Sequence, residues 1–314
     1  MTRVSGEFPS ASVVIPTYNR LAELGAVLDA LEQQAVPGRA RPEVVVVDDG
    51  SSDGTWAWLG RQRRSFDLVT LHQANCGPAQ ARNRGAEAAG GEVVLFLGDD
   101  TVPRPGWLVA HLEMHRILGD NGPVAGVGYT SFPGDQDTPF LRWINEYGAQ
   151  FGYLLIDNAA QVPFNFFYTS NISLPRRLLI ELGGFREDFP AAAWEDIELA
   201  YRASRKGLVL RYLPHALVTH HHRIQPRTFC RRQRTSGTSA AIFAQLHPEL
   251  EGFLGVTSRG RLGPLPAVQE TVLQGIVALG EGLPGVIPRW VYRRLLDVAY
   301  LRGLAEGLQS QGRR

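Results

Sequence analysis

Short apolar segments alternate with amphipathic segments along the first third of the chain. We expect strands where β-branched and other apolar residues run together, at residues 12–16, 44–47, 67–72 and 92–97. We expect helices where apolar residues recur at helical spacing, at residues 21–34, 53–63, 78–89 and 105–118. An uninterrupted run such as Val44 to Val47 is typical of a strand covered by helices on both faces. The alternation predicts an α/β fold with a mostly parallel sheet.

The pattern changes after about residue 123. Strand-like segments follow at 124–132 and 164–174, and between them an aromatic-rich stretch, 139–155, is expected to form a mobile helix or lid. Further helices are expected at 175–185 and 194–207, and strands at 208–214 and 216–222. From there on the pattern is helical, with an interruption near 255–265. We therefore expect two domains, a catalytic domain over 1–225 and a helical region over 226–314.

Composition narrows the class of protein only a little. The chain has 314 residues, 44% of them hydrophobic and 20% charged, and a formal net charge of +1. This charge gives no indication of nucleic-acid binding. Cys76 and Cys230 match no metal or redox spacing, which favours a reducing compartment. The first residues lack the apolar core of a signal peptide, and no apolar run reaches membrane-spanning length. We expect a cytoplasmic protein, with peripheral contact at the inner face of the membrane as an alternative.

Paired carboxylates follow two of the expected strands. Asp48 and Asp49 end the valine strand, and Asp99 and Asp100 end the strand at 92–97. In open α/β sheets this carboxyl end is where ligands bind, although Asp48 and its neighbours would also serve as caps of the next helix. Adjacent carboxylates repel one another unless a cation or a donor lies between them. A divalent cation that bridges a diphosphate would meet that need, and a ribose or a base N–H would satisfy the remaining oxygens.

Two further groups carry candidate chemistry. Glu195 and Asp196 begin the helix expected at 194–207, where acids are also stabilised by the helix dipole alone. A carboxylate at this place can take a proton from an acceptor hydroxyl as a general base. Three histidines, His220 to His222, end the last expected strand, and alternation along a strand lets one or two of them face a metal.

These segments together resemble family 2 glycosyltransferases. The resemblance rests on SVVIPTYNR, VVVVDDGSSDGT, NCGPAQARNRGAEAAGGEVVLFLGDDTVP and GGFREDFPAAAWEDIELAYRASRKG, in the order and spacing of the family over about residues 10–225. It implies a GT-A fold, Rossmann-like, with a mostly parallel sheet and helices on both faces. It also implies transfer of a sugar from a nucleotide-diphosphate sugar, most often a UDP-sugar, with inversion of configuration.

The resemblance assigns roles to individual positions. Asp49 matches the residue that reads the base. Asp99 matches a contact to ribose or sugar. Asp100 matches the usual ligand of Mn²⁺ or Mg²⁺, and His220 the further ligand of some members. Asp196 matches the catalytic base, with Glu195 beside it. The other positions that it implies for the nucleotide pocket are Pro16, Thr17, Tyr18, Asn19, Asn75, Gly77 and Arg82.

Two positions leave questions open within this resemblance. Arg82 suits a structural ion pair as well as it suits the nucleotide pocket. Gly98 stands where the family often has the first acid of its metal motif, which puts the strength of metal or ribose contact in question.

Other classes of protein are less compatible with the sequence. A dehydrogenase, methyltransferase or nucleotidyltransferase would require a glycine-rich first loop, and PTYNRLAELG has none. A catalytically silent module that binds a sugar nucleotide stays open, because Gly98 replaces an acid.

The C-terminal region raises the question of partners. Arg227, Arg231 and Arg234 share one helical face, which suits either solvent or the diphosphate of a nucleotide or lipid-linked acceptor. The last helix, 288–309, is amphipathic and is expected to pack in the core or form a homodimer, with membrane docking as the alternative. A saccharide or lipid-linked acceptor is expected for a cell-surface polysaccharide or glycolipid.

Overall fold

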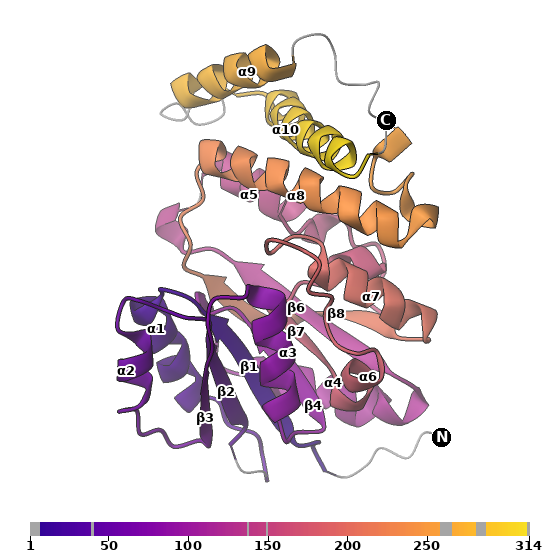
Figure 1. The fold of residues 1–314 in the computed structure, drawn as a ribbon. Coiled ribbons are helices and arrows are strands. Elements are labelled where there is room, and N and C mark those ends of the chain that lie inside the picture. The colour runs from indigo at the N-terminus through magenta and orange to yellow at the C-terminus, as the bar shows by residue number, and fades with distance from the viewer. Residues whose placement is uncertain are drawn as a thin grey trace. The chain divides into compact units, whose positions relative to one another are not determined.

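The computed structural model describes residues 7–38, 41–136, 138–148, 150–257, 266–280 and 287–312. The chain forms two compact units (Figure 1). The first comprises residues 1–133, 156–187 and 195–222, and the second comprises residues 134–155, 188–194 and 223–314. The second unit therefore draws two short segments from within the expected catalytic domain as well as the C-terminal helices.

An eight-stranded sheet is the centre of the first unit, with the order β3-β2-β1-β4-β7-β6-β8-β5. The first four strands are parallel, as the sequence predicts, because β1 pairs with β2 and β4, and β2 pairs with β3. The strands are β1 (Ala11–Thr17), β2 (Glu43–Asp48), β3 (Leu68–His72), β4 (Val93–Leu97), β5 (Thr101–Pro103), β6 (Val124–Ser131), β7 (Asn171–Pro175) and β8 (Val209–His220).

The second half of the sheet is mixed. β7 is antiparallel to both β4 and β6, and the short β5 is antiparallel to β8, whereas β6 and β8 are parallel. The pairing of β5 with β8 places Thr101 opposite His220. It therefore brings the last residue of β8 beside the acids that follow β4.

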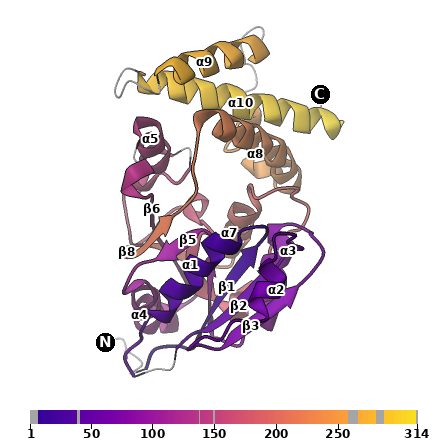
Figure 2. The same ribbon diagram turned by 90° about the vertical axis from the view of Figure 1, so that its left-hand side faces the viewer.

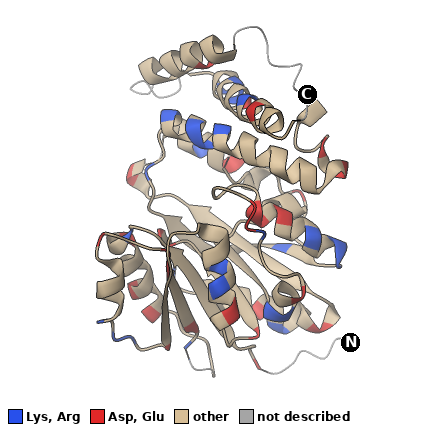
Figure 3. Ribbon diagram, in the orientation of Figure 1, with Lys and Arg blue, Asp and Glu red and all other residues tan. Residues whose placement is uncertain are grey.

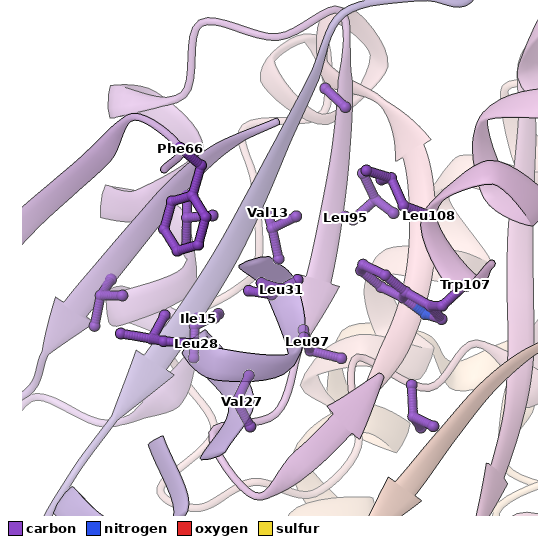
Figure 4. Close-up of a cluster of buried hydrophobic side chains, with 14 of the residues drawn as sticks. Val13, Ile15, Val27, Leu28, Leu31, Phe66, Leu95, Leu97, Trp107 and Leu108 are labelled. Carbon is purple, nitrogen blue, oxygen red and sulfur yellow. The ribbon is translucent and has the colours of Figure 1, made fainter. Parts of the chain in front are cut away.

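Helices cover both faces of the sheet in the first unit. These are α1 (Leu21–Glu32), α2 (Thr55–Leu59), α3 (Pro78–Ala88), α4 (Trp107–Leu118), α6 (Arg176–Glu181) and α7 (Glu195–Arg205). Side chains alternate along a strand, so Val13 and Ile15 point to one face, where α1 and α4 bury them in the cluster of Figure 4. Val14 points to the other face, and α3 approaches it so closely that a Cβ on Gly85 would overlap its side chain.

Several expected elements differ from those observed. Residues 164–174 were expected as one strand, but Phe164–Phe166 is a 3-10 turn and only Asn171–Pro175 is a strand. The two strands expected at 208–214 and 216–222 are one continuous strand, β8, which ends at His220. The register with β6 shifts between Gly128 and Tyr129, whose partners are Leu213 and Leu217. Pro214, which sequence reasoning took as a break, thus lies in a bulge of β8 and does not end the strand.

The second unit consists of helices, namely α5 (Pro139–Tyr147), α8 (Pro226–Leu246), α9 (Pro266–Gly280) and α10 (Arg289–Ser310). Short 3-10 turns occur at Gly119–Asn121 in the first unit and at Gly134–Gln136, Tyr153–Leu155 and Pro248–Leu250 in the second. Within this unit α10 lies between α8 and α9 (Figure 2). A close approach lets α10 pack on α8, because a Cβ on Gly303 would overlap the backbone of Arg234. Most of the interruption expected near 255–265 lies outside the described residues.

The apolar residues predicted for the last helix are buried within the second unit. Leu295, Leu296 and Val298 are inaccessible or nearly so, whereas Trp290 at the start of α10 is exposed. In the basic stretch of α8 (Figure 3), Arg234 pairs with Glu306 of α10, and Arg227 and Arg231 are exposed. In the described part of the chain, no helix is long and apolar enough to cross a membrane.

Candidate active site

The carboxyl ends of β1, β2 and β4 bring the predicted nucleotide residues together. Pro16 and Thr17 are the last two residues of β1, and the buried Thr17 hydroxyl donates a hydrogen bond to Asp99 (2.8 Å). Tyr18 follows and is exposed. Because Thr17 comes from β1 and Asp99 follows β4, this bond joins two strand ends directly.

Asn19 joins the first loop to the second. It has a left-handed backbone (φ 53°), which asparagine tolerates better than most residues. Its N–H donates to the Ser51 hydroxyl (2.9 Å), and its side-chain oxygen accepts from the Ser52 N–H (2.7 Å). The PTYN and DDGSS loops are thus held as one surface.

Asp48 and Asp49 are neighbours in sequence but have different partners. The fully buried Asp48 lies 2.9 Å from Nδ1 of His72 and accepts from the Ser51 N–H, so it closes the turn. Asp49 accepts hydrogen bonds from the Gln73 amide and from the N–H groups of Cys76 and Gly77, all between 2.8 and 2.9 Å. A carboxylate has about four acceptor positions, so Asp49 keeps capacity for one further donor.

Two glycines allow the loops to approach one another. Gly50 has a φ of +81°, and a Cβ there would lie 2.8 Å from the backbone nitrogen of Asn75. Gly77 also has a positive φ, of 90°, and precedes α3 directly. Asn75 itself is exposed beside them. The structure thus places Asn75 and Gly77, two positions that the resemblance implies for the nucleotide pocket, next to Asp49.

The guanidinium of Arg20 lies beside both Asp99 and Asp100, and sequence reasoning did not identify it. The guanidinium of Arg20 forms an ion pair with Asp100 and lies 3.8 Å from Asp99. Nε2 of His220 lies 3.3 Å from the Asp100 carboxylate, and both side chains are 10% exposed. A cation next to paired acids was expected on physical grounds, but no spacing in the sequence identifies Arg20 as its source.

The two acids have opposite pKa shifts. Burial and then the negative charge of Asp100 raise the pKa of Asp99 to about 7, against the charge of Arg20. Burial also acts to raise the pKa of Asp100, but the hydrogen bond and charge of His220, followed by the charge of Arg20, outweigh it and hold that pKa well below its usual range. Asp100 therefore stays ionised and available to a cation.

The site suits a divalent cation that a diphosphate completes. Among the described residues, no group of three or more His, Cys, Asp or Glu side chains is arranged to hold a metal ion. Asp100 and His220 lie 3.3 Å apart as candidate ligands, and Nδ1 of His220 is buried without a hydrogen-bond partner among the described residues. Mn²⁺ and Mg²⁺ are commonly bound by one or two carboxylates together with substrate phosphates, so two protein ligands fit such a cation.

His220, His221 and His222 have different neighbours in the structure. His220 faces Asp100 and stacks on His222, with ring centroids 5.7 Å apart. His221 donates its backbone N–H to the Asp100 carbonyl (2.7 Å). It also lines a small cavity of about 280 Å³ together with Ala22, Glu23, Ala26, Asp100 and Val102.

Glu195 and Asp196 begin α7, but only Asp196 is partly accessible. Asp196 accepts a hydrogen bond from the Ile197 N–H (2.9 Å) and a longer one from the Thr169 N–H (3.5 Å). Burial first, and the charge of Glu195 second, raise the pKa of Asp196 to about 7. A base with a pKa near the working pH is well suited to proton transfer.

Arg82 of α3 forms an ion pair with the first residue of α7. Its guanidinium donates to the Glu195 carboxylate (2.7 Å), and both side chains are almost fully buried. This is the structural ion pair that the sequence analysis left open as the alternative role of Arg82.

The mixed sheet, with paired acids at its carboxyl edge, agrees with the GT-A fold that the motifs imply. The sequence matches the family "Glycosyl transferase family 2" over residues 12–183. The chain therefore belongs to this family and is a family 2 glycosyltransferase, which confirms the resemblance, the fold class and the enzyme class inferred from the motifs.

Two similar proteins are named as glycosyltransferases. The chain is 28% identical over 296 residues to validoxylamine A glucosyltransferase of Streptomyces hygroscopicus, a match that covers 84% of this chain and 67% of the relative. It is 30% identical over 258 residues to pre-mycofactocin glycosyltransferase of Mycobacterium tuberculosis, covering 76% and 48% respectively. The chain thus spans about half to two thirds of the length of these relatives.

Solved structures share the fold at lower sequence identity. A mannosyltransferase from Pyrobaculum calidifontis in complex with GDP-Man and Mn²⁺ has a TM-score of 0.64 at 21% identity, covering 98% of this chain and 89% of that one. A fragment of S. aureus TarS in complex with UDP-GlcNAc has a TM-score of 0.56 at 19% identity, covering 97% and 92%.

Proposed function

We propose that this enzyme transfers a sugar from a nucleotide-diphosphate sugar, a UDP-sugar, to an acceptor hydroxyl with inversion. The observation that carries the proposal is the convergence of Thr17, Asp99 and Asp100 at one sheet edge, joined by the 2.8 Å hydrogen bond from Thr17. Neighbours of the same fold bind UDP-GlcNAc or GDP-Man, which supports a nucleotide-sugar donor and leaves its base and sugar to be determined.

The donor nucleotide is assigned to the loops after β1, β2 and β3. Asp49 would accept a hydrogen bond from the base through its remaining acceptor position, within reach of Asn75 and Gly77. Asn19 and Tyr18 would form the opposite side of this surface. Asp99 would contact the ribose or the sugar, and its hydrogen bond from Thr17 holds it in place.

Asp100 and His220 are the proposed ligands of Mn²⁺ or Mg²⁺. When bound, such a cation stabilises the negative charge that grows on the departing nucleoside diphosphate. The ionised state of Asp100 and the neighbouring His220 suit this role. Arg20, which pairs with Asp100, would exchange that contact for the phosphate oxygens when donor and cation arrive.

Asp196 is the proposed general base. It takes the proton of the acceptor hydroxyl, whose oxygen forms the new bond to the anomeric carbon as the bond to the diphosphate breaks. One base and no enzyme nucleophile give a single displacement, and attack from the face opposite the leaving group inverts the configuration. A saccharide or lipid-linked acceptor, as in cell-surface polysaccharide or glycolipid synthesis, agrees with this chemistry.

Donor turnover tests this assignment. UDP-glucose, UDP-N-acetylglucosamine and GDP-mannose would be incubated with the enzyme and Mn²⁺, and release of the nucleoside diphosphate would be measured. We expect Asp196→Asn to lower turnover about 10²- to 10⁴-fold while the donor still binds. Unchanged turnover in Asp196→Asn would remove Asp196 as the base. Donor binding without turnover by the native enzyme would instead favour the silent binding module.

A further inference from the structure

Arg82 of α3 connects the loops proposed to bind the nucleotide to the start of α7, the helix that carries Asp196. It lies in the middle of α3, which begins directly after Gly77, whose N–H donates to Asp49. Its side chain pairs with Glu195, the first residue of α7. The Nη1 to Oε1 distance is 2.7 Å, and the side chains are 11% and 3% exposed. Little solvent screens this pair, so its charges act strongly on their neighbours.

The Arg82 guanidinium is held from a second side. It lies over the ring of Phe185, 5.6 Å from the centroid. Asn83, the next residue of α3, fixes the backbone of Phe185, since its amide donates to the Phe185 carbonyl (2.8 Å) and its oxygen accepts from the Phe185 N–H (2.7 Å). The position of the positive charge is therefore set by packing as well as by Glu195.

Glu195 is only half satisfied. Its Oε2 atom is buried and has no hydrogen-bond partner among the described residues, although Oε1 is paired with Arg82. A buried and incompletely paired carboxylate imposes its negative charge on nearby groups. The nearest titratable group in the sequence is Asp196. The charged groups that act on it are Glu195 of its own helix and Arg82 of α3, and the neutral donors are the N–H groups of Thr169 and Ile197.

We propose that Arg82 and Glu195 are a positioning pair that sets the ionisation of Asp196, and that Arg82 acts through this pair instead of contacting the nucleotide. The two members have opposite effects. Glu195 disfavours the carboxylate form of Asp196 and Arg82 favours it, so the balance between them fixes the pH at which the base becomes active. The inference rests on the proposed role of Asp196 as general base.

Opposite shifts in the pH profile test the proposal. The readout is nucleoside diphosphate release from the best of the three donors named above, with water in place of the unidentified acceptor. We expect Glu195→Gln to move the midpoint of the acidic limb down by about half to one pH unit, since a like charge is removed. We expect Arg82→Met to move it up by a similar amount, and Arg82→Lys to restore the native midpoint even where the rate is lower.

A matched control lies on the same helix. Glu198 is fully buried and pairs with Arg202 at 2.9 Å, much as Glu195 pairs with Arg82, but at i+2 from Asp196 it projects to a different side. Glu198→Gln is therefore expected to lower stability without moving the midpoint. Shifts of Glu195→Gln and Arg82→Met in the same direction, or none, would overturn the proposal.

Two measurements distinguish a failure of the proposed positioning pair from a failure of the base assignment on which it rests. If Asp196→Asn abolishes turnover but the midpoints do not move, Asp196 is the base and the positioning pair is wrong. If Asp196→Asn turns over normally, the assignment of Asp196 as general base fails, and the positioning pair fails with it. A variant without turnover is followed through the pH dependence of its melting temperature, in which Glu195→Gln is expected to weaken the destabilisation caused by ionised Asp196 and Arg82→Met to strengthen it. Equal slopes in all three proteins would contradict the pair.

Discussion

Asp48 and Asp49 illustrate how neighbouring residues of one type take different roles. Both end a buried strand, and both would serve equally well as helix caps in a sequence pattern. The structure separates them by their partners, because Asp48 is enclosed by His72 and Ser51, whereas Asp49 is oriented by the N–H groups of Cys76 and Gly77. An oriented carboxylate with an open acceptor position suits recognition of a base.

Asp196 allows a prediction about stability. Its pKa in the folded protein is raised to about 7 by burial and then by Glu195, so its ionised form destabilises the fold. Native stability is therefore expected to fall as pH rises from the ordinary value of 3.8 toward about 7. Asp196→Asn removes this dependence. The melting temperature of the variant minus that of the native enzyme should thus increase by a few degrees between about pH 5 and pH 8.

The control for this prediction is Asp29→Asn, because the Asp29 side chain is 70% exposed. Its difference from the native melting temperature is expected to stay constant over the same range. A constant difference for Asp196→Asn as well would show that Asp196 titrates normally.

At the scale of the elements, a hydrogen-bond network of polar side chains joins α4 to β7. His115 donates from Nε2 to the Ser173 hydroxyl (2.9 Å), which donates to Nδ1 of His111 (2.9 Å), and Nε2 of His111 donates to Asn171 (3.0 Å). This is the assignment of protons that lets every group pair, because the Asn171 amide nitrogen donates elsewhere, to the carbonyl of Ala216 (2.9 Å). β7 begins two residues after Thr169, so this network supports the loop whose Thr169 N–H donates to Asp196.

The buried histidines predict a loss of stability in mild acid. Burial lowers the pKa of His111 to about 4 and of His115 to about 3, in the second case with help from the charge of His111. The unfolded chain takes up protons near pH 6.5 and the folded chain does not, so stability is present above 6.5 and is lost as pH falls toward 4. Urea unfolding should show a decrease on the order of 2 kcal/mol per histidine by about pH 5.

His115→Gln keeps a donor for Ser173 and removes one titrating group. Its unfolding free energy is expected to depend less on pH than that of the native enzyme. His215→Gln, at an exposed position of β8, serves as the control and should match the native dependence. If His115→Gln and the native enzyme have the same pH dependence, the buried histidines do not cause the acid lability.

The elements show where prediction from sequence succeeded and where it failed. The first four strands and α1, α3 and α4 follow from local periodicity, because each buries its apolar side chains on a simple repeat. The antiparallel β7 could not be foreseen, since pairing direction depends on distant segments. Arg20 was missed for the same reason: it reaches Asp99 and Asp100 only once β1 and β4 lie side by side.

At the scale of the whole molecule, the second unit has an exposed apolar face that bears on the expected membrane contact. α9 exposes Val268, Val272, Ile276 and Leu279 along one side, and Leu279 is 84% exposed. Its one charged residue, Glu270, is buried and pairs with Arg302. Arg294 of α10 donates a hydrogen bond to Gln269 of α9 (3.0 Å). Trp290, one turn before Arg294, is 65% exposed, and Arg289 and Arg293 are also exposed. Tryptophan and arginine beside an apolar face favour an anionic lipid surface.

Vesicle sedimentation tests that expectation. We expect the protein to pellet with phosphatidylcholine vesicles that contain phosphatidylglycerol more than with phosphatidylcholine alone. Ile276→Ser combined with Leu279→Ser should reduce this binding several-fold. Ile117→Ser combined with Ile180→Ser, at exposed positions of the first unit, is the control. Equal binding by the two double variants would contradict a lipid contact through α9, and a dimer lost only in the α9 variant would assign this face to a second copy.

The most direct test of the account is whether nucleotide binding depends on a divalent cation through Asp100. Melting temperatures would be measured with UDP or GDP, each with Mn²⁺ and with a chelator, in the native enzyme and in Asp100→Asn. A ligand at 100 times its dissociation constant adds about 2.7 kcal/mol, which gives a clear shift. We predict that a nucleoside diphosphate stabilises the native enzyme much more with Mn²⁺ than without, and that Asp100→Asn loses the Mn²⁺-dependent part. A nucleotide shift that is the same with Mn²⁺ and with chelator, and unchanged in Asp100→Asn, would contradict the proposed metal-assisted transfer.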